Sequence, residues 1–195
     1  MNLGWINDDS TTTKEDKAVI LHEFGHVLGL LHEHQSPARG WRLTLDEMAV
    51  YAYYAMTQAW NKTMIKSQII DVYNNTDVSN YSALDLKSIM MYFLPAPMNK
   101  QRIEVATNYE LSDLIKAYMM INYPRNPPHP TALKVGWTLD HALKVAGVSE
   151  STAEDILAVQ DDPATIRTLF TETLRSGRKS RVILVAYSVL TFIPL

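Results

Sequence analysis

H-E-F-G-H-V-L-G-L-L-H-E-H, residues 22–34 of this chain, holds four of its six histidines. His22 and His26 are four residues apart, so on an α-helix both imidazoles lie on one face, close enough to share one metal ion. Glu23 follows His22 directly, so its carboxylate can flank that metal without binding it. The spacing therefore predicts a helix that presents two metal ligands and one adjacent carboxylate.

A third ligand is expected from His32. Gly29 tolerates a positive φ, so the helix can end there and the chain can turn back under the metal. Three protein ligands plus a water are the arrangement of catalytic zinc, whereas structural zinc sites have four protein ligands, often Cys. The chain contains no Cys. His34 is an alternative ligand two residues further on, and we interpret it as a residue that lies at the surface or supports the metal ligands from behind.

This stretch resembles the signature of the metzincin zinc endopeptidases, H-E-x-x-H-x-x-G-x-x-H. Its fixed positions all match, and they are His22, Glu23, His26, Gly29 and His32. The resemblance implies one Zn²⁺ per chain on the three histidines. It also implies that Glu23 acts as general base and then general acid when water attacks a peptide bond.

A second motif, S-I-M-M-Y at residues 88–92, resembles the methionine turn of the same family. Together with Glu33 after the third histidine, it is most similar to the astacin branch. By this resemblance Met90 forms an apolar floor beneath the histidines, and Tyr92 is a detachable additional ligand that hydrogen-bonds the oxyanion. The likeness covers roughly residues 2–124 and implies a polypeptide substrate and an extracellular location.

Two functions follow from these motifs. The first is a zinc-dependent endopeptidase. The second is a non-catalytic zinc-binding protein of metzincin type, or an inactive fragment of a larger peptidase. A proteolytically dead relative would commonly lose Glu23, which is present here, so the sequence favours the enzyme.

Composition limits the remaining functions. With 47% hydrophobic residues, the chain can bury a sizeable core, and a formal net charge of −3 argues against a nucleic-acid partner. The apolar run at residues 182–195 is shorter than the roughly 20 residues that a membrane-spanning helix needs. We expect it to be a strand or a disordered end. The sequence does not determine the oligomeric state, and a monomer is the favoured expectation.

The predicted fold class is α+β and predominantly α, a metzincin-like catalytic domain with a reduced N-terminal sheet and a small helical C-terminal extension. The expected domains are 1–124 (catalytic), 125–136 (Pro-rich linker), 137–176 (helical extension) and 177–195 (a basic, then apolar tail). Tyr51, Tyr54 and Trp60 form an aromatic stripe that indicates core. Capping boxes predict helices at residues 12–28 (Thr12 with Glu15), at 44–60 (Thr44 with Glu47) and from 151 (Ser151 with Glu154). Further helices are predicted at 64–73, 112–123, 137–146 and from 163.

The segment before the zinc helix is short. In metzincins most of a twisted sheet precedes this helix, whereas here residues 3–6 provide room for one short strand. One strand does not form a stable sheet alone. Residues 1–10 also lack the basic flank and apolar run of a signal peptide. We therefore expect Met1 to be an internal methionine of a longer protein, with the apolar face of the zinc helix incompletely covered.

Overall fold

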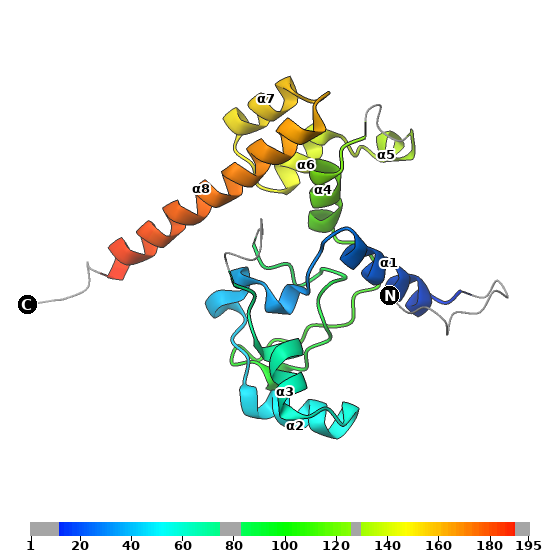
Figure 1. Ribbon diagram of the computed structural model, residues 1–195, viewed down its shortest axis with the longest axis vertical. Helices are drawn as coiled ribbons and strands as arrows, with labels where there is room; N and C mark the ends of the chain where they lie inside the picture. The colour runs from blue at the N-terminus through cyan, green and yellow to red at the C-terminus, as the bar shows by residue number, and fades with distance from the viewer. Residues whose placement is uncertain (1–11, 75–82, 126–129, 190–195) are drawn as a thin grey trace, which may run out of the picture. The chain divides into compact units, whose positions relative to one another are not determined.

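The computed structural model describes residues 12–74, 83–125 and 130–189, and packing divides the chain into two units, Met1–Ser112 and Asp113–Leu195. The predicted strand at residues 3–6 lies outside the described residues. Figure 1 shows the elements of the first unit, which are α1 (Lys14–Val27), η1 (Glu33–Gln35), η2 (Pro37–Arg42), α2 (Glu47–Gln58), α3 (Lys62–Ile65), η3 (Lys66–Ile70) and η4 (Ala96–Met98).

The predicted helix over residues 12–28 is confirmed as α1, but its cap is Thr13 instead of Thr12. The Thr13 hydroxyl accepts a hydrogen bond from the Asp16 N–H, and the Asp16 carboxylate accepts from the Thr13 N–H. This capping box satisfies N–H groups that have no partner inside the helix. Asp at the third helical position supplies the carboxylate that we assigned to Glu15.

Much of the apolar surface of α1 is exposed. The helix buries Ala18 and Gly25, whereas Phe24 is 52% and Val27 65% exposed. The expected incomplete cover of this helix is thus present among the described residues.

The core of the first unit lies against α2, α3 and η3, which pack against one another. Asp46 caps α2 through the Ala49 N–H, so the cap predicted at Thr44 is wrong. The helix predicted at residues 64–73 begins at Lys62 and changes to a π-helical turn, η3, that ends at Ile70. The buried core residues are Leu43, Leu45, Val50, Tyr54, Ile65, Ile69, Ile70, Met91, Leu94, Met98 and Val105.

The predominantly helical prediction is confirmed for the described residues. Their β-structure consists of two isolated antiparallel bridges, Leu45 with Asn99 and Leu94 with Val105. A sheet that would make the fold α+β is therefore not seen in these ranges. Within the described helices, none combines the length and the low charge that crossing a membrane demands.

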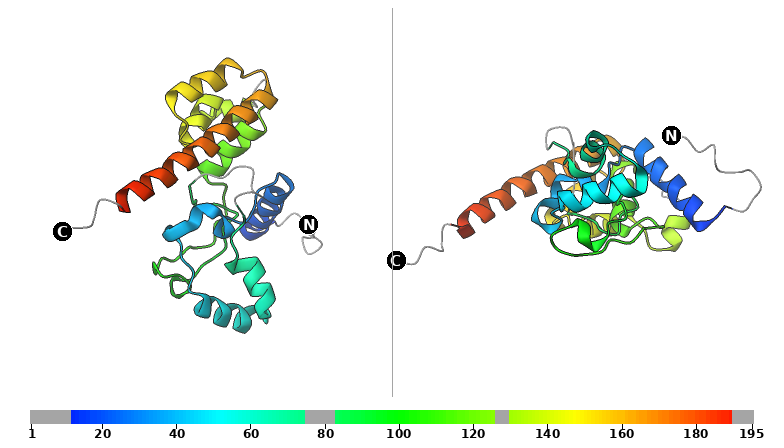
Figure 2. Two further views of the ribbon diagram at one scale, coloured as in Figure 1. Left: turned by 60° about the vertical axis from the view of Figure 1, so that its left-hand side comes forward. Right: turned by 90° about the horizontal axis from the view of Figure 1, so that it is seen from below.

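The second unit is a helical bundle. In Figures 1 and 2, α4 lies beside α6 and α8, and α7 lies beside α6 and α8, as their contacts require. Phe170, Ile156 and Leu143 are fully buried between them. The helices are α4 (Asp113–Asn122), α5 (Pro130–Lys134), α6 (Leu139–Val145), α7 (Glu150–Ala158) and α8 (Pro163–Val189).

Four details of this unit differ from the sequence-based expectations. Packing begins the unit at Asp113, inside the range predicted as catalytic, and the division into functional domains stays a prediction. Residues 130–134 of the predicted linker are helical, because Pro130 can occupy the first turn of a helix. Helix α8 continues through Val189, where a strand or a disordered end was expected, and α7 is capped by Ser149 instead of Ser151.

Candidate metal centre

Helix α1 presents two imidazoles whose orientation is held by backbone oxygens. His22 Nδ1 lies 2.8 Å from the Ile89 carbonyl oxygen, and His26 Nδ1 lies 2.9 Å from that of Leu30. A carbonyl oxygen can only accept, so each Nδ1 carries the proton and each Nε2 keeps its lone pair. This second interaction of a histidine is the usual device that orients a metal ligand.

The turn after α1 brings His32 to the other two histidines. The Leu30 N–H donates to the Gly25 carbonyl oxygen and the Gly29 N–H to that of His26, the two bonds of a Schellman motif. Gly29 has φ +83°, which a residue with a Cβ adopts only with strain. The predicted role of Gly29 in ending the helix and redirecting the chain is confirmed.

The three histidines can bind a metal ion. One ring nitrogen of each of His22, His26 and His32 lies within 4.8 Å of the others. The Nε2 atoms of His26 and His32 are 3.2 Å apart, close to the roughly 3.3 Å expected for two nitrogens bound tetrahedrally to one Zn²⁺. The lone pair of His26 Nε2 faces His32 Nε2, and one cation between the two nitrogens would be bound by both of them. The donor set therefore fits zinc.

His32 is suited to be a neutral ligand. Burial, followed by the nearby rings of His34, His26 and His22, lowers its pKa from 6.5 to about 4. Since metal binding requires the unprotonated imidazole, little competition from protons is expected at this nitrogen near pH 7.

The methionine turn lies directly beneath α1. The Met90 N–H donates to the Ser88 hydroxyl at 3.0 Å, which tightens the turn, and Asn108 donates its side-chain amide to the Ser88 carbonyl oxygen. Met90 is 1% exposed. A Cβ placed on Gly25 would lie 2.6 Å from the Met90 sulfur, so the thioether packs against the bare backbone of the metal-binding helix.

This contact makes a prediction for Gly25→Ala. In an ordinary helix interior the change stabilises by about 0.5–1 kcal/mol, but here the methyl group overpacks a buried site, which typically costs about 1–3 kcal/mol. We expect the free energy of unfolding, measured with urea on the metal-free chain, to fall by about 1 kcal/mol. The cost should shrink in a Met90→Val background, and a stabilised single variant would show that the sulfur does not restrict this position.

Glu33 connects the His32 segment to the methionine turn. Its N–H donates to the Met90 carbonyl oxygen at 3.0 Å, and its carboxylate accepts from the Asp85 N–H at 2.9 Å. Burial raises the pKa of Glu33 to about 7. The hydrogen bond from the Asp85 N–H opposes this rise, and the charge of the Asp85 carboxylate adds to it.

The segment after His32 is clamped to the π-helical turn by residues that sequence reasoning missed. The amide of Gln35 donates to the carbonyl oxygens of Ser67 and Asp71, at 2.8 and 3.1 Å. The Arg39 guanidinium bridges the His34 and Ile70 carbonyl oxygens, both at 2.8 Å. Gln35 and Arg39 lie in short 3₁₀ helices, where no periodic pattern marks a polar side chain that turns inward, so no sequence signal pointed to these bonds.

His34 belongs to this clamp, so of the two interpretations offered for it the surface residue is wrong, and the residue behind the ligands agrees with its position. It is 1% exposed, and its Nε2 lies 2.9 Å from the Gln68 carbonyl oxygen, so it donates there. Burial lowers its pKa to about 4. Its ring stacks on His32, with centroids 5.4 Å apart, which supports the ligand from behind.

Tyr92 stands beside the three ligands. Its ring centroid is 4.5 Å from that of His32 and 6.3 Å from that of His22. Burial raises the pKa of Tyr92, and the negative charge of Glu23 adds to this. The phenol therefore stays protonated at neutral pH and can donate a hydrogen bond.

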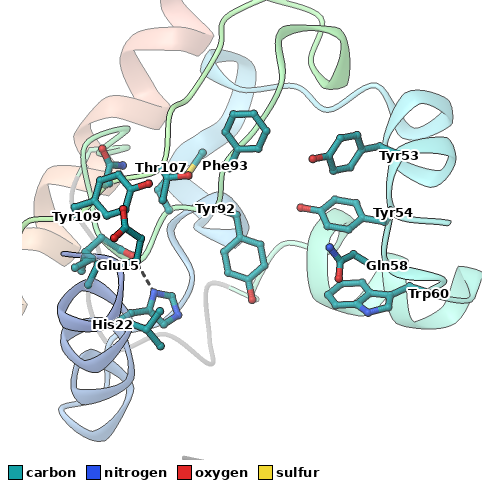
Figure 3. Close-up of a pocket in the computed structure, with 15 residues that line it drawn as sticks. Glu15, His22, Tyr53, Tyr54, Gln58, Trp60, Tyr92, Phe93, Thr107 and Tyr109 are labelled. Carbon is teal, nitrogen blue, oxygen red and sulfur yellow. Dashed lines mark hydrogen bonds between the residues drawn. The ribbon is translucent and has the colours of Figure 1, made fainter. Parts of the chain in front are cut away.

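A pocket of about 550 Å³ opens at this site. His22 and Tyr92 form part of its wall, and Figure 3 shows Tyr53, Tyr54 and Trp60 facing them across the space. The pocket thus has the candidate metal ligand His22 on one wall and aromatic rings on the opposite wall.

Comparison with solved structures found chains that are similar to this one. The chain is similar to a structure of myroilysin, with 37% identity over 62% of this chain and 58% of that chain, at a TM-score of 0.56. A crystal structure of myroilysin is 34% identical over 62% of this chain and 52% of that chain, at a TM-score of 0.36. No family model and no curated protein matches the chain. The chain spans less than two thirds of either solved chain, and the first likeness shows a shared fold over the part it covers.

Proposed function

We propose that this chain is a zinc-dependent endopeptidase of metzincin type, nearest to the astacin branch. The observation that carries the proposal is the convergence of His22, His26 and His32, with two Nδ1 protons bound by carbonyl oxygens. Similarity to a myroilysin structure supports a shared fold for this part of the chain.

When bound, zinc supplies Lewis acidity, which lowers the pKa of a bound water to about 7 and polarises a peptide carbonyl. Glu23, one residue beyond His22 on α1, takes the proton of the attacking water and passes it to the leaving amine. Tyr92 donates its phenolic hydrogen to the oxygen on which negative charge develops. Met90 and the hydrogen bonds of Gln35 and Arg39 hold the histidine ligands in position, and these residues do not contact a reacting atom.

Metal removal tests this function. The full chain, loaded with one equivalent of zinc, should cleave casein, and 1,10-phenanthroline should abolish the cleavage because the chelator withdraws the Lewis acid. Added zinc should restore the rate. Fragments are resolved by mass spectrometry, which separates internal cleavage from terminal trimming. A folded chain that binds zinc and leaves casein and unstructured peptides intact would instead indicate a zinc-binding protein without peptidase activity.

A further inference from the structure

We propose that the pocket beside His22 selects a large, uncharged aromatic side chain of the substrate, next to the scissile bond, and rejects an acidic one. This rests on the proposed peptidase function and adds the substrate class to it.

The first step is the position of the pocket. His22 is both a candidate metal ligand and part of the pocket wall, as is Tyr92. A peptide whose carbonyl group is activated at the metal therefore has a neighbouring side chain at the entrance. Figure 3 shows the space that such a side chain would enter, between α1 and the rings of Tyr54 and Trp60.

The second step is the nature of the wall. Tyr54 and Trp60 stack at a centroid distance of 5.3 Å with an interplanar angle of 16°, and the ring of Tyr53 meets Tyr54 edge-on at 5.3 Å. Phe93 and Tyr109 also line the pocket. Such a wall offers an aromatic guest offset-stacked or edge-to-face contacts, which are worth about 0.5–1.5 kcal/mol beyond the burial of area.

The third step is charge. Of the pocket-lining residues in the described ranges, Glu15 is acidic, and neither Lys nor Arg is among them. Lys14 lies nearby, but its ammonium group is held over the outer Tyr109 ring, 4.9 Å from the centroid. An incoming carboxylate would lose its hydration, would find neither Lys nor Arg on the pocket wall and would meet the charge of Glu15, so acidic side chains are disfavoured.

A series of four peptides tests both parts of the claim. The peptides are identical except at the two residues that flank one cleavable bond. In each peptide both of these residues are Phe, Ala, Asn or Asp. Phe should exceed Ala by about 10–100-fold in kcat/KM, the effect of burying a large apolar side chain. Asn should exceed Asp at least about tenfold, because the two have nearly the same shape and differ in charge.

A charge variant identifies the pocket as the cause. Gln58 lines the pocket and is exposed. Gln58→Lys should shift the Asp-to-Asn ratio towards Asp at least about fivefold, since a cation now meets the carboxylate. Gln160→Lys is the control: it adds the same charge in the turn that follows α7, and Gln160 does not line the pocket. It should leave the Asp-to-Asn ratio unchanged.

Binding separates this inference from the proposed function. Peptide hydroxamates carrying the same four side chains are titrated calorimetrically against the zinc-loaded chain, and their affinities should follow the same order. If they do while no peptide is cleaved, the peptidase proposal fails and the pocket assignment stands. If peptides are cleaved with equal efficiency, or Asp is preferred, the pocket assignment is overturned while the peptidase function stands.

Discussion

In the Glu23→Gln variant we expect the rate of peptide hydrolysis to fall by roughly 10²–10⁴-fold, the usual contribution of a positioned proton-transfer group. The amide keeps the shape of the carboxylate but cannot take a proton from water. Zinc content should stay at one per chain, because Glu23 is not among the three side chains that converge on the site. The measurement is kcat/KM on an internally quenched peptide, with zinc quantified in the same samples.

Tyr92→Phe belongs in the same assay as a second variant. It removes the hydroxyl and keeps the ring that contacts His32 and His34. A rate loss of about 10²–10³-fold, with zinc retained, is expected for an oxyanion donor. Full turnover in Glu23→Gln would remove that residue from the mechanism, and full turnover in Tyr92→Phe would leave Tyr92 as a packing residue.

His32→Ala should weaken zinc binding by at least about 10²-fold. Structural zinc is bound with an apparent free energy of about 10–16 kcal/mol, and roughly a third of this is lost with one of three ligands. The affinity is measured by competition with a chromogenic chelator. Urea unfolding of the metal-free variant verifies that the change lies in the metal site and not in the fold.

Two control variants make this prediction specific. His34→Gln keeps a hydrogen-bond donor for the Gln68 carbonyl oxygen. It should lower the zinc affinity by no more than about tenfold, which is the smallest effect usual for a residue that only orients a metal ligand. His141→Ala changes a histidine of α6 and should have no effect. Loss of zinc in His34→Gln together with retention in His32→Ala would reverse the assignment of the third ligand.

The geometry of the candidate metal centre is the part of this protein that the sequence predicted best. Helical spacing alone puts His22 and His26 on one face, and a glycine is the residue expected where the helix reverses. The structure confirms both, since Gly29 has a positive φ and the three histidines meet. The helical spacing and the glycine turn are local features. They can be predicted because a few backbone dihedral angles fix the positions of residues that are close in the chain.

Helix ends were predicted less well, although helices themselves were found. Thr12 and Thr13 both precede α1, and each has a carboxylate three residues on, so the pattern fits two registers equally. Packing selected Thr13. The caps of α2 and α7 were predicted two residues from their observed positions, because Thr44 and Ser151 are each followed by Glu three residues on, whereas the observed caps Asp46 and Ser149 are not.

What the sequence determined by itself was therefore which three histidines converge and in what order, the turn between them and the predominance of helix. Tertiary structure alone decided that His34 is buried, that Gln35 and Arg39 clamp the ligand segment, and that the Tyr54–Trp60 stack also lines a pocket. The reason is physical: these contacts join residues about 30 or more positions apart, and their energies depend on which carbonyl oxygens and ring faces remain unsatisfied once the helices have packed.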